Sequence, residues 1–126
     1  MINKIHKIGI VTDNIEDAVD FYTQKLGLKV TERFSNEGDE DYVFLDAGGI
    51  ILELMPQRTM GVAPGVHHIS FKVDNLGIAT QRLREQGVSI TKEPIDVGGD
   101  TGISLSFFEG PNNLNLQLYS REERTT

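Results

Sequence analysis

Residues 66–75 read VHHISFKVDN, and residues 5–14 read IHKIGIVTDN, so this chain carries one pattern twice. Each copy runs from a histidine through alternating apolar residues, which is the spacing of a half-buried β-strand. Each strand then ends in Asp-Asn before an apolar residue, and asparagine is a favoured N-cap of an α-helix. The repeat therefore predicts two units of the same construction.

The segments that follow each copy also keep the same order. Residues 15–26 predict a helix, because apolar side chains recur at three- and four-residue spacing, namely Ile15, Ala18, Val19, Tyr22 and Leu26. Apolar segments predict strands over residues 28–34, 42–45 and 50–55. The second half repeats this with a helix over 75–86, strands over 88–91, 103–108 and 114–119, and a loop over 95–102. The predicted fold is α+β, with two paired βαβββ modules forming a cupped sheet.

The domain organisation follows from the same repeat. We expect one domain over residues 1–126, with module one at 3–56, a linker at 57–65 that is rich in Gly and Pro, and module two at 66–120. The free faces of the two sheets are predicted to line the cup, and a small-molecule ligand is expected there.

The composition narrows the classes of partner. The net charge of −7, from 12 basic and 19 acidic residues, argues against nucleic acid, which requires clustered Lys and Arg. No apolar run approaches the length needed to cross a membrane, and the N-terminus does not resemble a signal peptide, so a cytoplasmic location is expected. The absence of cysteine excludes a thiolate metal site and a cysteine nucleophile.

Strand alternation assigns side chains to the two faces of each sheet. It turns one polar residue from each of four strands away from the helices and into the cup: Lys7, Glu53, His68 and Gln117. Glu53 is a carboxylate among apolar strand residues and therefore needs a partner. One interpretation needs neither a metal nor catalysis: Glu53 forms a salt bridge with Lys7. In the corresponding interpretation of His68, this side chain is a hydrogen-bonded histidine that lines a pocket. His6 and His67 lie on the other strand faces and are expected to be structural.

Four segments carry a resemblance to a known family: IHKIGIVTDNIEDAVDFYTQKLGLKV, IILELMP, GVHHISFKVDN and FFEGPNNLNLQLY. In order and spacing the chain resembles the vicinal oxygen chelate superfamily, which includes glyoxalase I, bleomycin-resistance proteins, extradiol dioxygenases and methylmalonyl-CoA epimerase. Its motifs are most similar to glyoxalase I and the epimerase. The resemblance implies paired βαβββ modules and a homodimer. It also implies that the four divalent-metal positions of metal-using members fall on Lys7, Glu53, His68 and Gln117.

Two of these positions depart from the family pattern. A protonated lysine repels a metal ion, so Lys7 is a poor ligand unless it loses its proton. The position of Gln117 is normally a glutamate that moves a proton next to a carbonyl, and glutamine cannot accept a proton at neutral pH. The two histidines and one carboxylate that an iron dioxygenase needs are not supplied.

Two functional hypotheses follow, from different classes. In the first, the chain is a glyoxalase-like lyase or isomerase with an altered metal site. Glu53, His68 and Gln117 would then hold zinc, nickel, cobalt or manganese, and Glu53 would be the catalytic base. The substrate would contact four residues: Lys7, Ser70, Gln117 and Tyr119.

The second hypothesis is a metal-free protein of the bleomycin-resistance type that binds or sequesters a small organic molecule. Lys7 and Glu53 would then form an ion pair. A third idea has Lys7 holding an anionic substrate group or forming a Schiff base, since a desolvated lysine can be activated.

Overall fold

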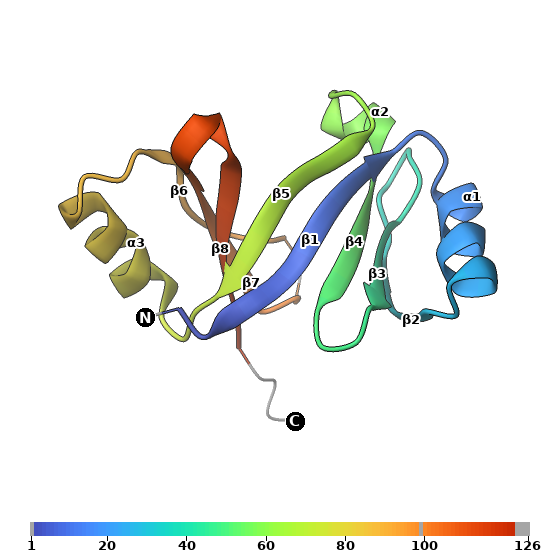
Figure 1. Ribbon diagram of the computed structural model, residues 1–126, viewed down its shortest axis with the longest axis horizontal. Coiled ribbons are helices and arrows are strands. Elements are labelled where there is room, and N and C mark those ends of the chain that lie inside the picture. The colour runs from blue at the N-terminus through green and yellow to red at the C-terminus, as the bar shows by residue number, and fades with distance from the viewer. Residues whose placement is uncertain (1, 99, 123–126) are drawn as a thin grey trace. The chain divides into compact units, whose positions relative to one another are not determined.

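The computed structural model describes residues 2–98 and 100–122, and it contains both helices and strands (Figure 1). The chain divides into two compact units. One unit is Lys7–His67, and the other joins the described residues up to His6 with those from His68 onward. Each unit has the predicted βαβββ order, which confirms the α+β fold class. None of the described helices has the length and apolarity to span a bilayer.

The unit Lys7–His67 takes most of β1 (Lys4–Thr12) and is completed by α1 (Ile15–Asp20), η1 (Phe21–Lys25), β2 (Lys29–Phe34), β3 (Tyr42–Asp46), β4 (Ile51–Pro56) and α2 (Gln57–Met60). Its strands lie in the order β2-β3-β4-β1, with β1 parallel to β4 and the other pairs antiparallel. Helix α1 packs on one face of this sheet. Its core consists of Ile15, Val19, Val43, Leu45 and Leu54.

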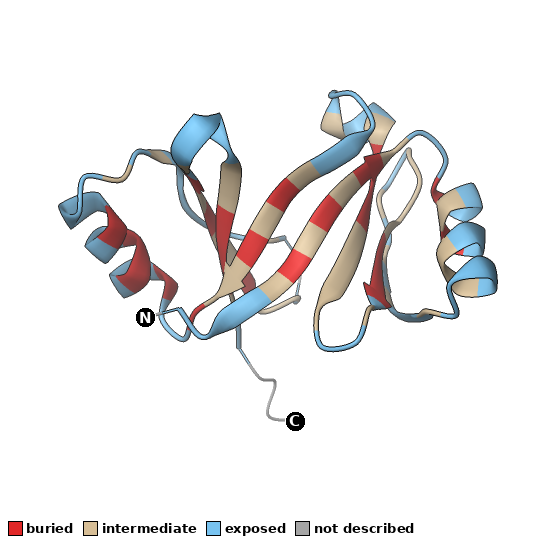
Figure 2. Cartoon of the chain, in the orientation of Figure 1, coloured by how far each residue is buried: buried red, intermediate tan, exposed pale blue. Residues whose placement is uncertain are grey.

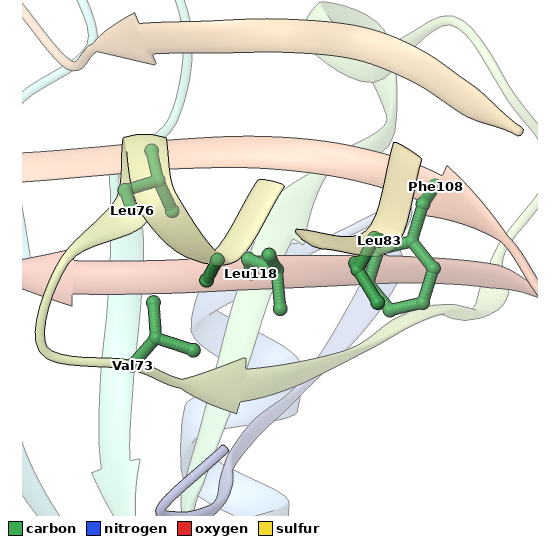
Figure 3. Close-up of a cluster of buried hydrophobic side chains, with 6 residues drawn as sticks. Val73, Leu76, Leu83, Phe108 and Leu118 are labelled. Atoms are coloured by element: carbon green, nitrogen blue, oxygen red, sulfur yellow. The ribbon is translucent and has the colours of Figure 1, made fainter. Parts of the chain in front are cut away.

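The second unit contains β5 (Gly65–Lys72) from His68 onward, α3 (Leu76–Glu85), β6 (Ile90–Asp96), β7 (Ile103–Glu109), η2 (Pro111–Asn113) and β8 (Asn115–Arg121). The strand order is β5-β8-β7-β6, with β5 parallel to β8. Helix α3 covers one face. Figure 3 shows its side chains meeting those of the sheet, in a core made of Val73, Leu76, Ala79, Leu83, Phe108 and Leu118.

The two Asp-Asn motifs of the repeat are helix starts, as predicted. Asn14 Oδ1 accepts a hydrogen bond from the backbone N–H of Asp17 at 3.0 Å, and Asn75 Oδ1 accepts one from Ile78 at 2.9 Å. Each bond satisfies one of the backbone donors that the first turn of a helix leaves unpaired.

Replacing the second cap tests its contribution. Asn75→Ala is expected to lower the free energy of unfolding by about 1 kcal/mol, because Ile78 N–H loses its acceptor. Urea denaturation followed by circular dichroism measures the change. Asn75→Ser is the control, since serine also caps a helix and should recover most of the loss. An Asn75→Ala variant as stable as the parent would contradict the capping role.

The first predicted helix is wrong at its end. Helix α1 stops at Asp20, and Phe21–Lys25 forms a π-helical turn, which inserts an additional residue relative to an α-helical turn. Leu28 N donates to Tyr22 O at 3.0 Å and closes the segment. Leu26 therefore leaves the apolar stripe and is 56% exposed instead of lying in the core.

Two further boundaries differ from the predicted ones. Residues 57–60 of the expected linker form the one-turn helix α2, which Gly61 ends at a left-handed φ of 69°. Strand β6 runs on to Asp96, so the loop predicted over 95–102 begins later. Register shifts in the pairing of β6 with β7 accompany this longer strand. A four-residue helix is too short to leave an apolar repeat in the sequence.

Candidate functional site

Lys7 and Glu53 lie on the face of the unit Lys7–His67 that α1 does not cover. Gly9 of β1 is registered opposite Glu53 of β4, and Lys7 shares the face of Gly9 because strand faces alternate. Figure 2 shows the resulting bands of buried and partly buried residues along β1. Phe44 of β3 is registered opposite Glu53, and Lys7 Nζ lies 5.8 Å from the centroid of the Phe44 ring. The structure thus brings together a cation, an aromatic face and a carboxylate.

The Lys7 side chain is 2% exposed, and this burial changes its acidity. Burial disfavours the charged ammonium and lowers the pKa of Lys7 to about 8, although the negative charge of Glu53 opposes the shift. At neutral pH Lys7 is therefore still mainly protonated. The aromatic ring of Phe44 is a favourable neighbour for such a cation.

The second unit carries a polar face of its own, made by His68, Ser70 and Gln117, all buried. Ser70 of β5 is registered opposite Gln117 of β8, and Ser70 Oγ donates a hydrogen bond to Gln117 Oε1 at 2.7 Å. The His68 ring meets Phe107 edge-on, with centroids 5.6 Å apart, and Phe107 is registered opposite Gln117. The predicted residues of this half are therefore neighbours on one face.

Tyr119 is the remaining predicted contact residue. It is buried, and its ring lies against His6, with centroids 4.2 Å apart. Leu105 of β7 and Lys72 of β5 are registered beside it. The expected structural role of His6 stays a prediction.

Sequence reasoning did not single out Tyr42, although the structure adds it to the face of Glu53. Tyr42 begins β3 two residues before Phe44 and so shares its face. Its hydroxyl donates to Met60 Sδ of α2 at 3.3 Å. Burial, followed by the charges of Glu53 and Asp39, raises the pKa of the phenol. The two-residue spacing between Tyr42 and Phe44 indicates that both side chains lie on one strand face. To place that face beside Glu53, however, one must also know that β3 pairs with β4.

The residues at the four family metal positions do not fit a divalent ion. Lys7 presents an ammonium group, which has no lone pair to donate and repels a cation. The Gln117 carbonyl oxygen, the ligand atom of that side chain, accepts the Ser70 hydroxyl. Within residues 2–98 and 100–122, no three His, Asp or Glu side chains gather as a metal centre.

Comparison with known proteins establishes the family. The Glyoxalase/Bleomycin resistance protein/Dioxygenase superfamily matches residues 4–118. The chain belongs to this superfamily. It is 34% identical to the uncharacterized protein YwkD of Bacillus subtilis strain 168, over 96% of this chain and 99% of that protein. It is 28% identical to lactoylglutathione lyase of Escherichia coli O157:H7, over 87% of each.

Solved structures share the fold. A hypothetical protein, BH1468 of Bacillus halodurans C-125, superposes with a TM-score of 0.79 at 25% identity, covering 98% of this chain and 97% of that one. A methylmalonyl-CoA epimerase of Streptomyces coelicolor, in complex with 2-nitronate-propionyl-CoA, gives a TM-score of 0.78 at 21% identity, over 98% of this chain and 100% of that one. The second likeness concerns the fold alone.

Proposed function

We propose that this protein is a glyoxalase-like lyase or isomerase for a small organic molecule and that Lys7 and Glu53 do its chemistry without a metal at the four strand positions. The observation that carries the proposal is a buried ammonium on the same sheet face as a carboxylate, opposite the helix-covered core. The relatives named lactoylglutathione lyase and methylmalonyl-CoA epimerase support this reaction class.

The proposed step is a proton transfer next to a carbonyl group. The Glu53 carboxylate removes a proton from the carbon beside the carbonyl, and the electron pair of that C–H bond moves onto the carbonyl oxygen. The Lys7 ammonium stabilises the negative charge that develops there, because a fixed charge in a buried site acts more strongly than in water. Glu53 then returns the proton to the same carbon, and the electron pair moves back from the oxygen to restore the C=O bond. In an α-hydroxy carbonyl compound Glu53 can instead deliver the proton to the former carbonyl carbon, while the substrate's own hydroxyl hydrogen moves to the former carbonyl oxygen and the second carbon becomes the carbonyl. Either route is an isomerisation that needs no other reactant.

The polar face of the second unit is proposed to bind an oxygen atom of a small organic molecule. With Gln117 Oε1 engaged by Ser70, the amide nitrogen of Gln117 is the atom left to donate a hydrogen bond. A donor at this position suits a carbonyl or carboxylate oxygen better than a metal. His68 and Tyr119 are proposed as further ligand contacts.

Solvent-deuterium exchange tests the function. The protein is incubated in D₂O with S-lactoylglutathione or methylmalonyl-CoA, and mass spectrometry measures deuterium beside the carbonyl. Glu53→Gln is expected to slow exchange by about 100-fold or more, because glutamine cannot take the proton. Glu109→Gln, at an exposed position of β7, is the matched control and should exchange like the parent. Unchanged exchange in Glu53→Gln, or none in the parent with either compound, would refute the proposed step.

A second candidate is metal-free binding of the bleomycin-resistance type, which the attraction between Lys7 and Glu53 favours. Its signature is binding of a small molecule without deuterium exchange. Calorimetric titration with zinc, nickel, cobalt and manganese tests the hypothesis that Glu53, His68 and Gln117 bind a divalent metal. Affinity tighter than about millimolar would restore it. Lys7→His should tighten metal binding, since it replaces an ammonium with a ligand nitrogen.

The quaternary state and location are also proposals. We propose a homodimer, which light scattering during size-exclusion chromatography tests by giving twice the monomer mass. We propose a cytoplasmic location, which cell fractionation tests.

A further inference from the structure

The face that carries Lys7 and Glu53 has a further polar group that the proposed step does not use. Tyr42 and Phe44 are two residues apart in β3, so both point to the side on which Phe44 is registered opposite Glu53. The charge of Glu53 contributes to the raised pKa of the Tyr42 phenol, which places the two groups within electrostatic reach. Tyr42 is half-buried.

The acceptor that this hydroxyl uses is a weak one. Tyr42 Oη donates to Met60 Sδ, and a thioether sulfur is a poorer acceptor than a carbonyl or carboxylate oxygen. A tyrosine phenol is protonated at neutral pH, and burial, which raises the pKa of Tyr42 further, does not change this, so Tyr42 is a donor. A ligand oxygen would gain a stronger hydrogen bond by taking the place of the sulfur, at little cost to the protein.

The segment that holds Met60 is suited to such an exchange. Helix α2 is a single turn, and side chains fasten it to the loop between β2 and β3: Asn36 Nδ2 donates to Thr59 Oγ1 at 2.7 Å, and Thr59 donates to Asp39. Met60 is unbranched and half-buried, so it can turn away without disturbing these bonds.

We propose that Tyr42 is a ligand-binding residue that donates its hydroxyl hydrogen to a carboxylate or carbonyl oxygen, and that Met60 occupies this donor when no ligand is present. The assignment rests on the proposed function, because the oxygen would belong to the molecule that Lys7 and Glu53 handle. It adds to that function a ligand class: organic acids or carbonyl compounds with an acceptor oxygen positioned for Tyr42.

Methyl NMR tests the exchange directly. The chain has three methionines, so protein with ¹³C-labelled methionine methyl groups gives few resonances, and Met60→Leu assigns that of Met60. Pyruvate, which has both a carboxylate and a carbonyl oxygen, is the probe. Titration should shift the Met60 resonance in the parent, and Tyr42→Phe should weaken pyruvate binding about tenfold, the loss expected for one hydrogen bond to a charged group.

Tyr22→Phe is the matched control, because it removes a tyrosine hydroxyl from the helix-packed side of the same unit. It should bind pyruvate like the parent. Thermal melting of each variant confirms folding. Binding by Tyr42→Phe equal to that of the parent would overturn the assignment, as would the absence of any Met60 shift in the parent. Deuterium exchange in Glu53→Gln tests the proposed function and the methyl NMR titration tests Tyr42, so the failure of one is distinguishable from the failure of the other.

Discussion

Lys7→Met is expected to stabilise the protein by about 2 kcal/mol at pH 7. The fall in the pKa of Lys7 from 10.5 to about 8 corresponds to a net cost of about 3 kcal/mol for holding the charge in the folded state. Methionine fills a similar volume without that charge. Glu53 loses an attractive neighbour in the variant, which reduces the gain. Chemical denaturation of both proteins at pH 7 measures the difference.

The stability advantage of Lys7→Met over the parent should decrease as the pH rises. Below pH 8 Lys7 is protonated in both the folded and the unfolded parent, so the full cost is present. Between about 8 and 10.5 the folded parent releases the proton first, and its stability rises because the unfolded state binds more protons. The advantage of Lys7→Met should therefore shrink across this window. Lys29→Met, at an exposed position of β2, is the control and should change stability by less than about 0.5 kcal/mol.

The same substitution should abolish the deuterium exchange proposed above, because the developing oxyanion loses its cation. A variant that is more stable and inactive would show that the buried ammonium is retained for function at the expense of stability. A Lys7→Met protein less stable than the parent at pH 7 would contradict this account, and so would an advantage that grows above pH 8.

Leu118→Ala is the second large effect, with an expected loss of about 3–4 kcal/mol in the free energy of unfolding. Leu118 is 0% exposed and packs with α3 in the core of its unit, so truncation leaves a cavity between helix and sheet. Urea denaturation should give a lower midpoint with an unchanged slope, which is the mark of altered stability rather than altered compactness.

Leu114→Ala is the matched control for the core substitution. Leu114 precedes β8 and is 49% exposed, so the same chemical change removes little buried surface. It should cost less than about 0.5 kcal/mol. Equal losses for the two variants would contradict the placement of Leu118 in the core.

The sequence was sufficient to predict those features of the fold that depend on a single local pattern. The Asp-Asn repeats predicted both helix caps, which the structure confirms. Strand alternation predicts that Leu114, Leu116 and Leu118 face the helix; Leu116 and Leu118 do pack against α3, whereas Leu114 precedes β8 and is 49% exposed. Sequence-based prediction failed where the backbone departs from the regular period. The apolar stripe of residues 15–26 is compatible with a continuous α-helix, and nothing in its spacing reveals the π-helical turn.

The candidate site was predictable to a similar degree. Alternation named Lys7, Glu53, Ser70 and Gln117 as face residues, but the Ser70–Gln117 hydrogen bond depends on the register of β5 with β8. Tyr42 was missed for a related reason. Its significance comes from the pairing of β3 with β4 and from the short helix that follows β4, and neither is a property of its neighbours in sequence.

The first residues of the chain belong to the unit that is completed last. Asn3 N donates to the carbonyl of Lys72 at 2.9 Å, and its side chain donates to Asp74 at 3.0 Å. During synthesis this N-terminal segment can therefore form its hydrogen bonds only after β5 has been made. The sheet that it joins is complete only after β8 has left the ribosome. Contacts so distant in sequence form slowly. A bulky group fused before Asn3 would consequently slow the folding of the C-terminal half of the chain.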